Sequence, residues 1–311
     1  MSNLLLRKID EYLKLRRAFG TKLEGAEAPL RKFVAFLQTV GTRFVTTARA
    51  LEWAAHPQGV TASHRVARLR WVRSFAAFLN AADPRHEVPP ANLLVGRARR
   101  ARPYLYSKSE INAVLQAART LPSPRHLRAA TYATILGLLA VTGLRRSEVI
   151  ALDRADVDLA AGVLTVRKSK FGKTRLVPLH RTTTQALRAY ARQRDLVVPI
   201  ALSDGFFLSE SGTRITGWAL QYTWVKLTRQ VGLRGPRDRR GPRMHDLRHR
   251  FAAESLLGWY RRGLDASRRL PVLSAYLGHV HVADTYWYLE AIPELLERAL
   301  QRLDRPVEVV R

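Results

Sequence analysis

The stretch from Thr131 to Val141 is apolar on nearly every side, and Arg145 and Arg146 close it. A helix with apolar residues all round must be covered by other parts of a fold or by lipid. A bilayer span needs roughly 20 such residues, and this run is well short of that length. We therefore expect a buried helix at 131–142 and no membrane partner.

The first 82 residues or so have the spacing of amphipathic helices. Apolar residues recur every three or four positions, and Thr46 is a candidate N-cap. The four expected helices are marked by Leu5, Ile9, Tyr12 and Leu13; by Leu30, Phe33, Val34 and Leu37; by Thr46–Ala55; and by His64–Asn80.

A domain boundary follows, because prolines and a basic run resist regular structure. Pro84, Pro89 and Pro90 precede a segment with four arginines in six residues: Arg97, Arg99, Arg100 and Arg102. We expect a helical DNA-binding domain at 1–96, a basic linker at 97–103 and a second domain at 104–311.

The second domain is expected to be mostly helical with one β insert. Val163–Arg167 and Arg175–Leu179 are short β-type runs, joined by the basic segment Lys168–Thr174. A further strand near Asp156–Leu159 would extend this hairpin. The predicted fold class is mainly α with a small antiparallel β-sheet.

Charge indicates the partner. The chain has 53 Lys and Arg against 25 Asp and Glu, a net charge of +28, which favours a polyanion such as double-stranded DNA. There is no Cys, and the N-terminus does not resemble a secretory signal, so we expect a cytoplasmic, nucleoid-associated protein. For any single arginine a solvated surface is the alternative to a phosphate contact; the candidates, besides the linker, are Arg65, Arg68, Arg73, Arg237 and Arg240.

Two short motifs suggest a phosphate site. On a helix, His245, Arg248 and His249 share one face, where a guanidinium and an imidazole can bind one phosphate. By itself this motif fits a solvated helix face equally well. In the turn 142–148, Arg145 leaves the buried helix near a helix N-terminus, where an oxyanion is favoured, and Glu148 can orient it.

With these segments in order, the chain resembles the tyrosine recombinase, or phage-type integrase, family over nearly its whole length. The family's T-G-L-R-x-S-E turn matches Arg145, its H-x-L-R-H element His245 and Arg248, and its L-G-H element His279. Its hairpin pattern places the family lysine at Lys170, with Lys168 and Lys173 nearby. The family's tyrosine follows the L-G-H histidine by nine residues, which gives Tyr288, with Tyr286 as the rival.

The resemblance implies an enzyme that cuts DNA by attack of Tyr288 on a backbone phosphate, leaving a 3′-phosphotyrosine and a 5′-hydroxyl. Arg145 and Arg248 would bind the charged oxygens, with a further hydrogen bond from His279. Lys170 would protonate the leaving 5′ oxygen, and His245 would assist the tyrosine proton. Glu148 would support the site. No cofactor or metal is expected.

The resemblance also implies a homotetramer on two DNA sites and a mobile-element integrase, and leaves accessory proteins open. A C-terminal apolar stripe would pack on its own domain or on a neighbouring subunit: Ile292, Leu295, Leu296, Ala299, Leu300 and Leu303. The alternatives are a non-catalytic DNA-binding accessory protein of the same fold and a type IB topoisomerase, which would act without a specific site. The sequence assigns no catalytic role to His249.

Overall fold

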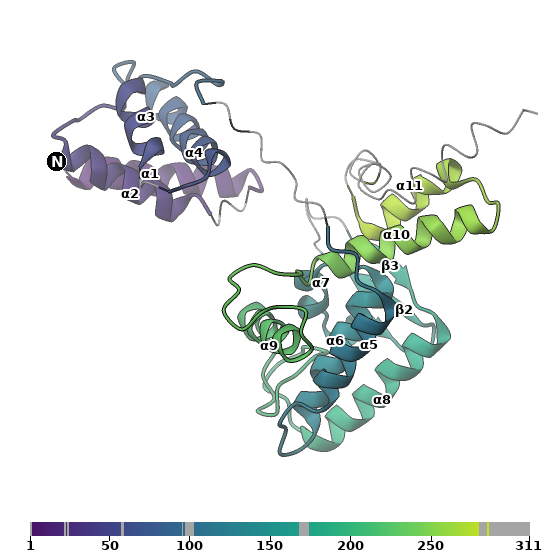
Figure 1. The fold of residues 1–311 in the computed structure, drawn as a ribbon. Helices are drawn as coiled ribbons and strands as arrows, with labels where there is room; N and C mark the ends of the chain where they lie inside the picture. Colours follow the sequence, from purple (N-terminus) through teal and green to yellow (C-terminus); the bar gives the residue numbers. More distant parts are fainter. Residues whose placement is uncertain are drawn as a thin grey trace, which may run out of the picture. The chain divides into compact units, whose positions relative to one another are not determined.

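The computed structural model folds the chain into two compact units, residues 1–101 and 102–311 (Figure 1). The structure describes residues 2–21, 23, 25–56, 59–94, 96, 103–167, 174–279 and 285. The arginine-rich stretch 97–102 and the apolar stripe 292–303 lie outside the described residues.

The first unit is helical, as the apolar spacing predicts. Thr46 and Thr61 cap two of its helices, each hydroxyl accepting a backbone N–H three residues on at 3.3 Å. Ile9, Phe33 and Phe75 are fully buried in one core that all the helices share. The helices are α1 (Ser2–Ala18), α2 (Glu27–Thr39), α3 (Thr47–Ala55) and α4 (Ala62–Asn80).

The second unit combines helices with one small sheet, so the expected fold class is confirmed. Ser107 begins its first helix with a reciprocal capping box to Glu110. Its elements are α5 (Lys108–Arg119), α6 (Leu127–Thr142), α7 (Arg146–Ala151), the 3₁₀ turn η1 (Arg154–Asp156), β1 (Val157–Asp158), β2 (Val163–Val166), β3 (Arg175–Pro178), α8 (Arg181–Val197), α9 (Gly217–Gln230), α10 (Asp246–Arg261) and α11 (Ala266–Leu277).

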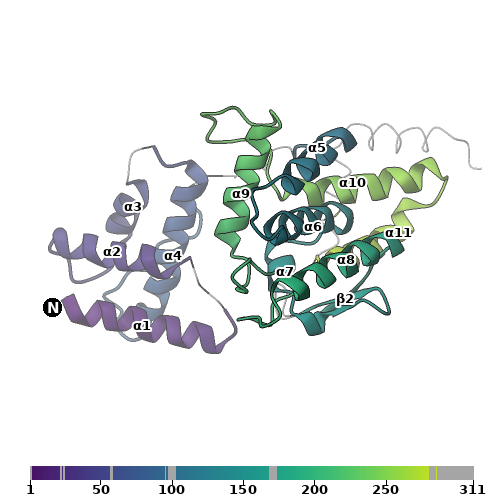
Figure 2. The same cartoon turned by 90° about the horizontal axis from the view of Figure 1, so that it is seen from below.

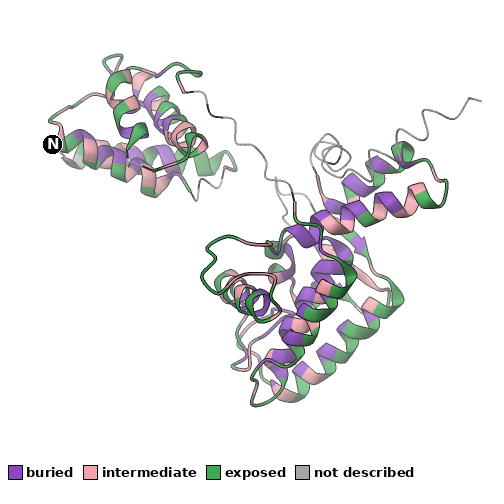
Figure 3. Ribbon diagram, in the orientation of Figure 1, coloured by how far each residue is buried: buried purple, intermediate pink, exposed green. Residues whose placement is uncertain are grey.

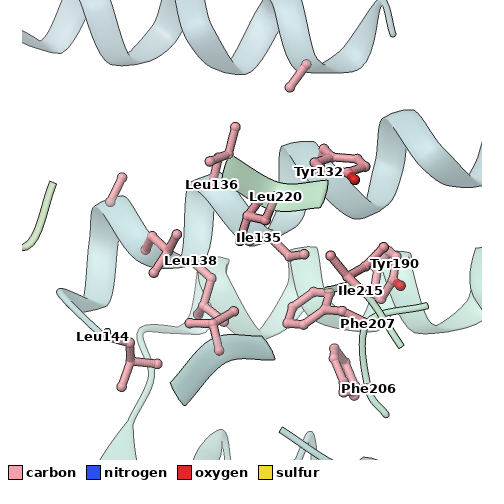
Figure 4. Packing of buried hydrophobic residues seen from close by; sticks show 14 of the residues in the cluster. Tyr132, Ile135, Leu136, Leu138, Leu144, Tyr190, Phe206, Phe207, Ile215 and Leu220 are labelled. Atoms are coloured by element: carbon pink, nitrogen blue, oxygen red, sulfur yellow. The ribbon is translucent and has the colours of Figure 1, made fainter. Parts of the chain in front are cut away.

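Helix α6 is the expected buried helix. Helices α5, α8 and α10 pack against it (Figure 2), and Ile135 and Leu136 are at most 2% exposed. Figure 4 shows Ile135 and Leu136 among three buried residues: Phe207, Tyr190 of α8, and Leu220 of α9. No described helix has the length and apolar character needed to cross a bilayer.

The sheet is three-stranded and antiparallel, in the order β1-β2-β3, so the expected hairpin and its extension are present. Val163 lies opposite Pro178, and Val166 lies opposite Arg175. The inward residues Leu164, Val166 and Val177 are at most 2% exposed. This register places Arg175 at the end of β3 that follows the basic connection, of which residues 168–173 lie outside the described residues.

Helices α10 and α11 form a helical hairpin with its own small core. Leu256, Leu270, Leu273 and Leu277 are at most 4% exposed in it, and Figure 3 shows buried positions along both helices. Helix α10 also packs on α6, and α11 packs on β3. The end of α11 is thereby held beside the sheet and the turn that follows α6.

Candidate active site

The turn after α6 fixes the backbone of Arg145. Gly143 ends α6 with φ 61°, and a Cβ there would lie 2.6 Å from the Phe251 ring, so only glycine fits. Arg145 is the N-cap of α7. Its backbone N–H donates to Glu148 Oε2 at 2.8 Å, and its Nη1 donates to Glu148 Oε1 at 2.8 Å. Glu148 therefore orients Arg145 at both ends.

Arg248, in the first turn of α10, ties three elements together. Its Nη1 donates to the Gly143 carbonyl at 2.8 Å, and its Nη2 donates to the Leu277 carbonyl at 2.7 Å. The residue is only 3% exposed. The two motifs that contain Arg145 and Arg248 are thus adjacent, although 103 positions separate them in the sequence.

His279 follows the end of α11 and lies next to the same arginines. Arg145 Nη2 donates to the carbonyl of Gly278 at 3.1 Å, one residue before His279. The His279 ring is held by Thr285, with 2.7 Å between Nδ1 and Oγ1. Because Thr285 is fully buried, this contact fixes the direction of the ring.

His245 is the N-cap of α10 and lines a cavity of about 500 Å³ together with Arg145. Burial and the charge of Arg248 lower the pKa of His245. The His249 ring lies edge-on to it, 4.7 Å between centroids, and burial with the proximity of His245 lowers the pKa of His249 to about 4. His249 is therefore neutral at neutral pH, and the lowered pKa of His245 favours its neutral form, which can accept a proton.

Glu148 is buried at 8% exposure and accepts hydrogen bonds from two arginines. Its second partner is Arg175, whose Nη1 and Nη2 reach the two carboxylate oxygens at 3.0 and 2.9 Å. Burial raises the pKa of Glu148, but the bonds from Arg175 and Arg145 outweigh it and lower the pKa overall. Arg175 is not among the site residues predicted from the sequence; the signal available for it is an arginine at the start of an otherwise apolar strand.

The structure thus brings Arg145, His245, Arg248 and His279 together around the ends of α6 and α11. Lys170 and both candidate tyrosines, Tyr286 and Tyr288, lie outside the described residues. Among the described residues, no three His, Asp or Glu side chains gather in a way that would hold a metal ion.

The expected DNA contacts have mixed surroundings. Arg237 and Arg240 are exposed, as is Arg73, whose Nε donates to the Pro89 carbonyl. Arg65 is half-buried. Arg68 differs from the outward placement expected for it: its guanidinium lies 3.6 Å from the Trp53 ring centroid and donates to the Trp53 carbonyl.

The arginine-rich loop 234–243, which leads to α10, contains two further arginines besides the predicted DNA contacts Arg237 and Arg240 that lie close to the site. Arg234 and Arg243 line the cavity of Arg145 and His245. Arg243 is held there by Asp246, to which its Nη2 donates at 2.7 Å. The candidates chosen from the sequence, Arg237 and Arg240, do not line it.

Comparison with known proteins gives a consistent result. A family model described as "Phage integrase family" matches residues 105–294. The chain is 48% identical over 301 residues to y4rB of Sinorhizobium fredii, covering 96% of each chain. It is 30% identical to the tyrosine recombinase XerD of Caulobacter vibrioides over 244 residues, 78% of this chain and 76% of that one.

Solved structures show the same fold. A post-cleavage complex of the XerH site-specific recombinase with a palindromic difH substrate has a TM-score of 0.67 at 20% identity, over 90% of this chain and 79% of that one. The Tn1549 transposon integrase in complex with circular intermediate DNA has a TM-score of 0.65 at 16% identity, over 95% and 99% of the two chains.

Proposed function

The chain belongs to the phage integrase family, the tyrosine recombinases, and from that premise we propose how its residues cut and rejoin DNA. The protein is a site-specific DNA recombinase. The observation that supports a working site is the convergence of Arg145, His245, Arg248 and His279 at the ends of two helices. A non-catalytic relative would not need this set in one place.

The nucleophile in this proposal is Tyr288. Its oxygen attacks a backbone phosphorus, the bond to the 5′ oxygen breaks, and a 3′-phosphotyrosine forms. The 5′-hydroxyl of another strand then attacks this ester and releases the tyrosine. The phosphodiester count does not change, so no nucleotide is consumed.

The two arginines stabilise the charge that grows on the non-bridging oxygens. Arg145 lines the cavity and is held by Glu148 and the Gly278 carbonyl, so it needs little reorganisation. Arg248 is held by the carbonyls of Gly143 and Leu277, which fix the plane of its guanidinium beside Arg145. Because Arg248 is 3% exposed, a phosphate reaches it only after the side chains that cover it move.

Proton transfer falls to the remaining residues. His245 has a lowered pKa and faces the cavity, which suits the acceptor of the Tyr288 proton. His279, whose ring Thr285 holds through Nδ1, donates a hydrogen bond to a phosphate oxygen. Lys170 precedes β3 in the sequence by five positions and supplies the proton for the leaving 5′ oxygen.

The test uses a nicked duplex that carries the protein's own site, found by footprinting the DNA beside its gene. A nick close to the scissile phosphate lets the short fragment with the new 5′-hydroxyl diffuse away after cleavage. Without this hydroxyl the strand cannot be rejoined, so the covalent complex accumulates. We expect an SDS-resistant complex with wild type and with Tyr286→Phe, and none with Tyr288→Phe. Mass spectrometry of the digested complex should place the nucleotide on Tyr288.

Three results would change this assignment. Tight binding of the site without any covalent complex would favour the accessory-protein alternative. A complex that survives Tyr288→Phe but not Tyr286→Phe would move the nucleophile. Relaxation of supercoiled plasmids that lack the site would favour a type IB topoisomerase.

We further propose a homotetramer that joins two duplex sites, with contacts through the apolar stripe 292–303, and action at the nucleoid in the cytoplasm. A protein encoded by a mobile element fits the likeness to a transposon integrase. Light scattering on and off DNA would test the tetramer, and reconstitution from purified components would show whether accessory proteins are required.

A further inference from the structure

The end of α11 is surrounded by arginines. Gly278 adopts φ 70°, and the N–H groups of Gly278 and His279 close a Schellman turn onto the carbonyls of Ala275 and Ser274. The next three carbonyls along the chain each accept a different arginine: Tyr276 from Arg175 Nε at 2.8 Å, Leu277 from Arg248 Nη2 at 2.7 Å, and Gly278 from Arg145 Nη2 at 3.1 Å.

These bonds have a simple physical basis. The last carbonyls of a helix lack partners within it and form the negative end of the helix dipole. Cations stabilise that end. Each carbonyl at the end of α11 binds one guanidinium and so fixes its position along the helix axis. The end of α11 therefore sets the spacing of the arginines around it.

Arg175 differs from Arg145 in what surrounds it. It does not line the cavity of Arg145 and His245, and its side chain is 11% exposed. Its remaining nitrogens bind both oxygens of Glu148. One planar guanidinium thus joins the end of α11 to the carboxylate that orients Arg145.

The fit around Arg175 is close. A Cβ on Gly278 would lie 2.6 Å from Arg175 Nη1, so the bare backbone of Gly278 makes room for the guanidinium. Arg175 is also the first residue of β3, directly after the hairpin connection that contains Lys170. The same residue therefore anchors the base of that hairpin.

We propose that Arg175 is a positioning residue for strand cleavage. It holds Glu148 and the end of α11 at one separation, so that Arg145 and Arg248 meet the same phosphate, and it anchors the strand that follows Lys170. It touches no reacting atom. The proposal rests on the recombinase function above, and its effect is on the rate of cleavage rather than on the affinity for DNA.

The central variant is Arg175→Lys, which keeps the charge but loses the three-way planar geometry. We expect single-turnover formation of the covalent complex at saturating nicked duplex to slow by about 10²-fold, the effect of a displacement of about 1 Å at a catalytic group. The Kd for the duplex should stay within about threefold, since phosphate contacts elsewhere determine binding.

Arg194→Lys is the matched control. Arg194 is also buried, binds a backbone carbonyl (Phe206, 2.8 Å) and pairs with a carboxylate (Asp195), but it lies on α8 and lines neither the cavity nor the end of α11. Measured below both melting temperatures, the control should lose stability and cleave at the wild-type rate. Arg175→Gln replaces Arg175→Lys if the lysine variant does not fold.

A double variant separates positioning from general loosening. If Arg175 acts through Arg145 and its neighbours, then Arg145→Lys/Arg175→Lys loses less cleavage rate than the two single variants predict when their losses are combined. Cleavage by Arg175→Lys within twofold of wild type, additive rate losses in the double variant, or an equal loss in the Arg194 control would overturn the proposal. If wild type itself forms no covalent complex, the recombinase function fails instead, so the two failures are distinguishable.

Discussion

The second unit holds its arginines in two different ways. Around the ends of α6 and α11, Arg145, Arg175 and Arg248 bind backbone carbonyls, and two of them share the buried Glu148. In the loop 234–243, Arg237 and Arg240 are exposed. Fixed cations suit a transition state, because they need no reorganisation as charge develops. Exposed cations suit a polyanion of any sequence, because their contacts with phosphates release counterions from the DNA.

The largest expected effect is on the rate of cleavage, and it comes from the arginines that bind backbone carbonyls. Arg145→Ala and Arg248→Ala should each slow covalent-complex formation by about 10²–10³-fold at saturating DNA, the usual effect of removing one preorganised donor. The matched control is Arg237→Ala, which removes an exposed arginine and should cleave at the wild-type rate. If instead Arg248→Ala weakens DNA binding and leaves the cleavage rate at saturating DNA unchanged, Arg248 acts like the exposed arginines and the contrast is wrong.

The second effect is on stability. Glu148→Gln leaves the partly buried Arg145 and Arg175 without their shared counter-charge, which should lower the free energy of unfolding of the second unit by about 3 kcal/mol. Glu254→Gln is the control, since its pair with Arg250 is exposed on the carboxylate side and should contribute under about 1 kcal/mol. Urea unfolding followed by circular dichroism measures both, and equal losses would contradict the contrast.

The third effect is the pH dependence of stability, which comes from His249, the neighbour of Arg248 on α10, and not from the exposed arginines. Burial first, then His245, lowers the pKa of His249 to about 4, whereas an unfolded histidine titrates near 6.5. The unfolded state therefore binds more protons between these values. The resulting stability is complete above pH 6.5 and is lost as the pH falls towards 4.

The measurement compares wild type with His249→Gln, which cannot titrate. Between pH 7.5 and 5, wild type should lose about 2 kcal/mol more than the variant. His245, whose pKa is also lowered, contributes the same trend in both proteins. The other charged groups that act on His249 are Asp246, Arg243 and Arg248. Parallel pH curves would show that His249 is not held neutral.

The features that could be predicted from sequence are mostly local. The hydroxyls of Thr46 and Ser107 bind N–H groups within one turn, and the apolar run of α6 needs only its own composition to indicate burial. Motif order then placed Arg145, His245, Arg248 and His279 in one site, because a family resemblance contains tertiary information that composition lacks.

The role of Arg175 could not be predicted in the same way. Its partner Glu148 is 27 positions away in the sequence, and the Tyr276 carbonyl is 101 positions away. Every residue has a backbone carbonyl, so the sequence does not indicate which one accepts a hydrogen bond from Arg175. The same holds for Arg68, which was expected to face outward: a tryptophan 15 positions earlier covers it. Of nine arginines between 234 and 262, periodicity alone does not separate those that line the cavity from those in solvent.

The smallest effect is expected for the exposed arginines of the loop 234–243. Arg237→Ala and Arg240→Ala should each reduce the slope of log Kd against log salt by about 1, and weaken binding evenly across DNA sequences. Cleavage at saturating DNA should stay within twofold of wild type, because neither side chain lines the cavity. Fluorescence anisotropy between 50 and 200 mM salt, roughly the range over which such contacts are screened, measures the slope. A variant with an unchanged slope but slower cleavage would show that this arginine acts in the cleavage step and not in DNA binding.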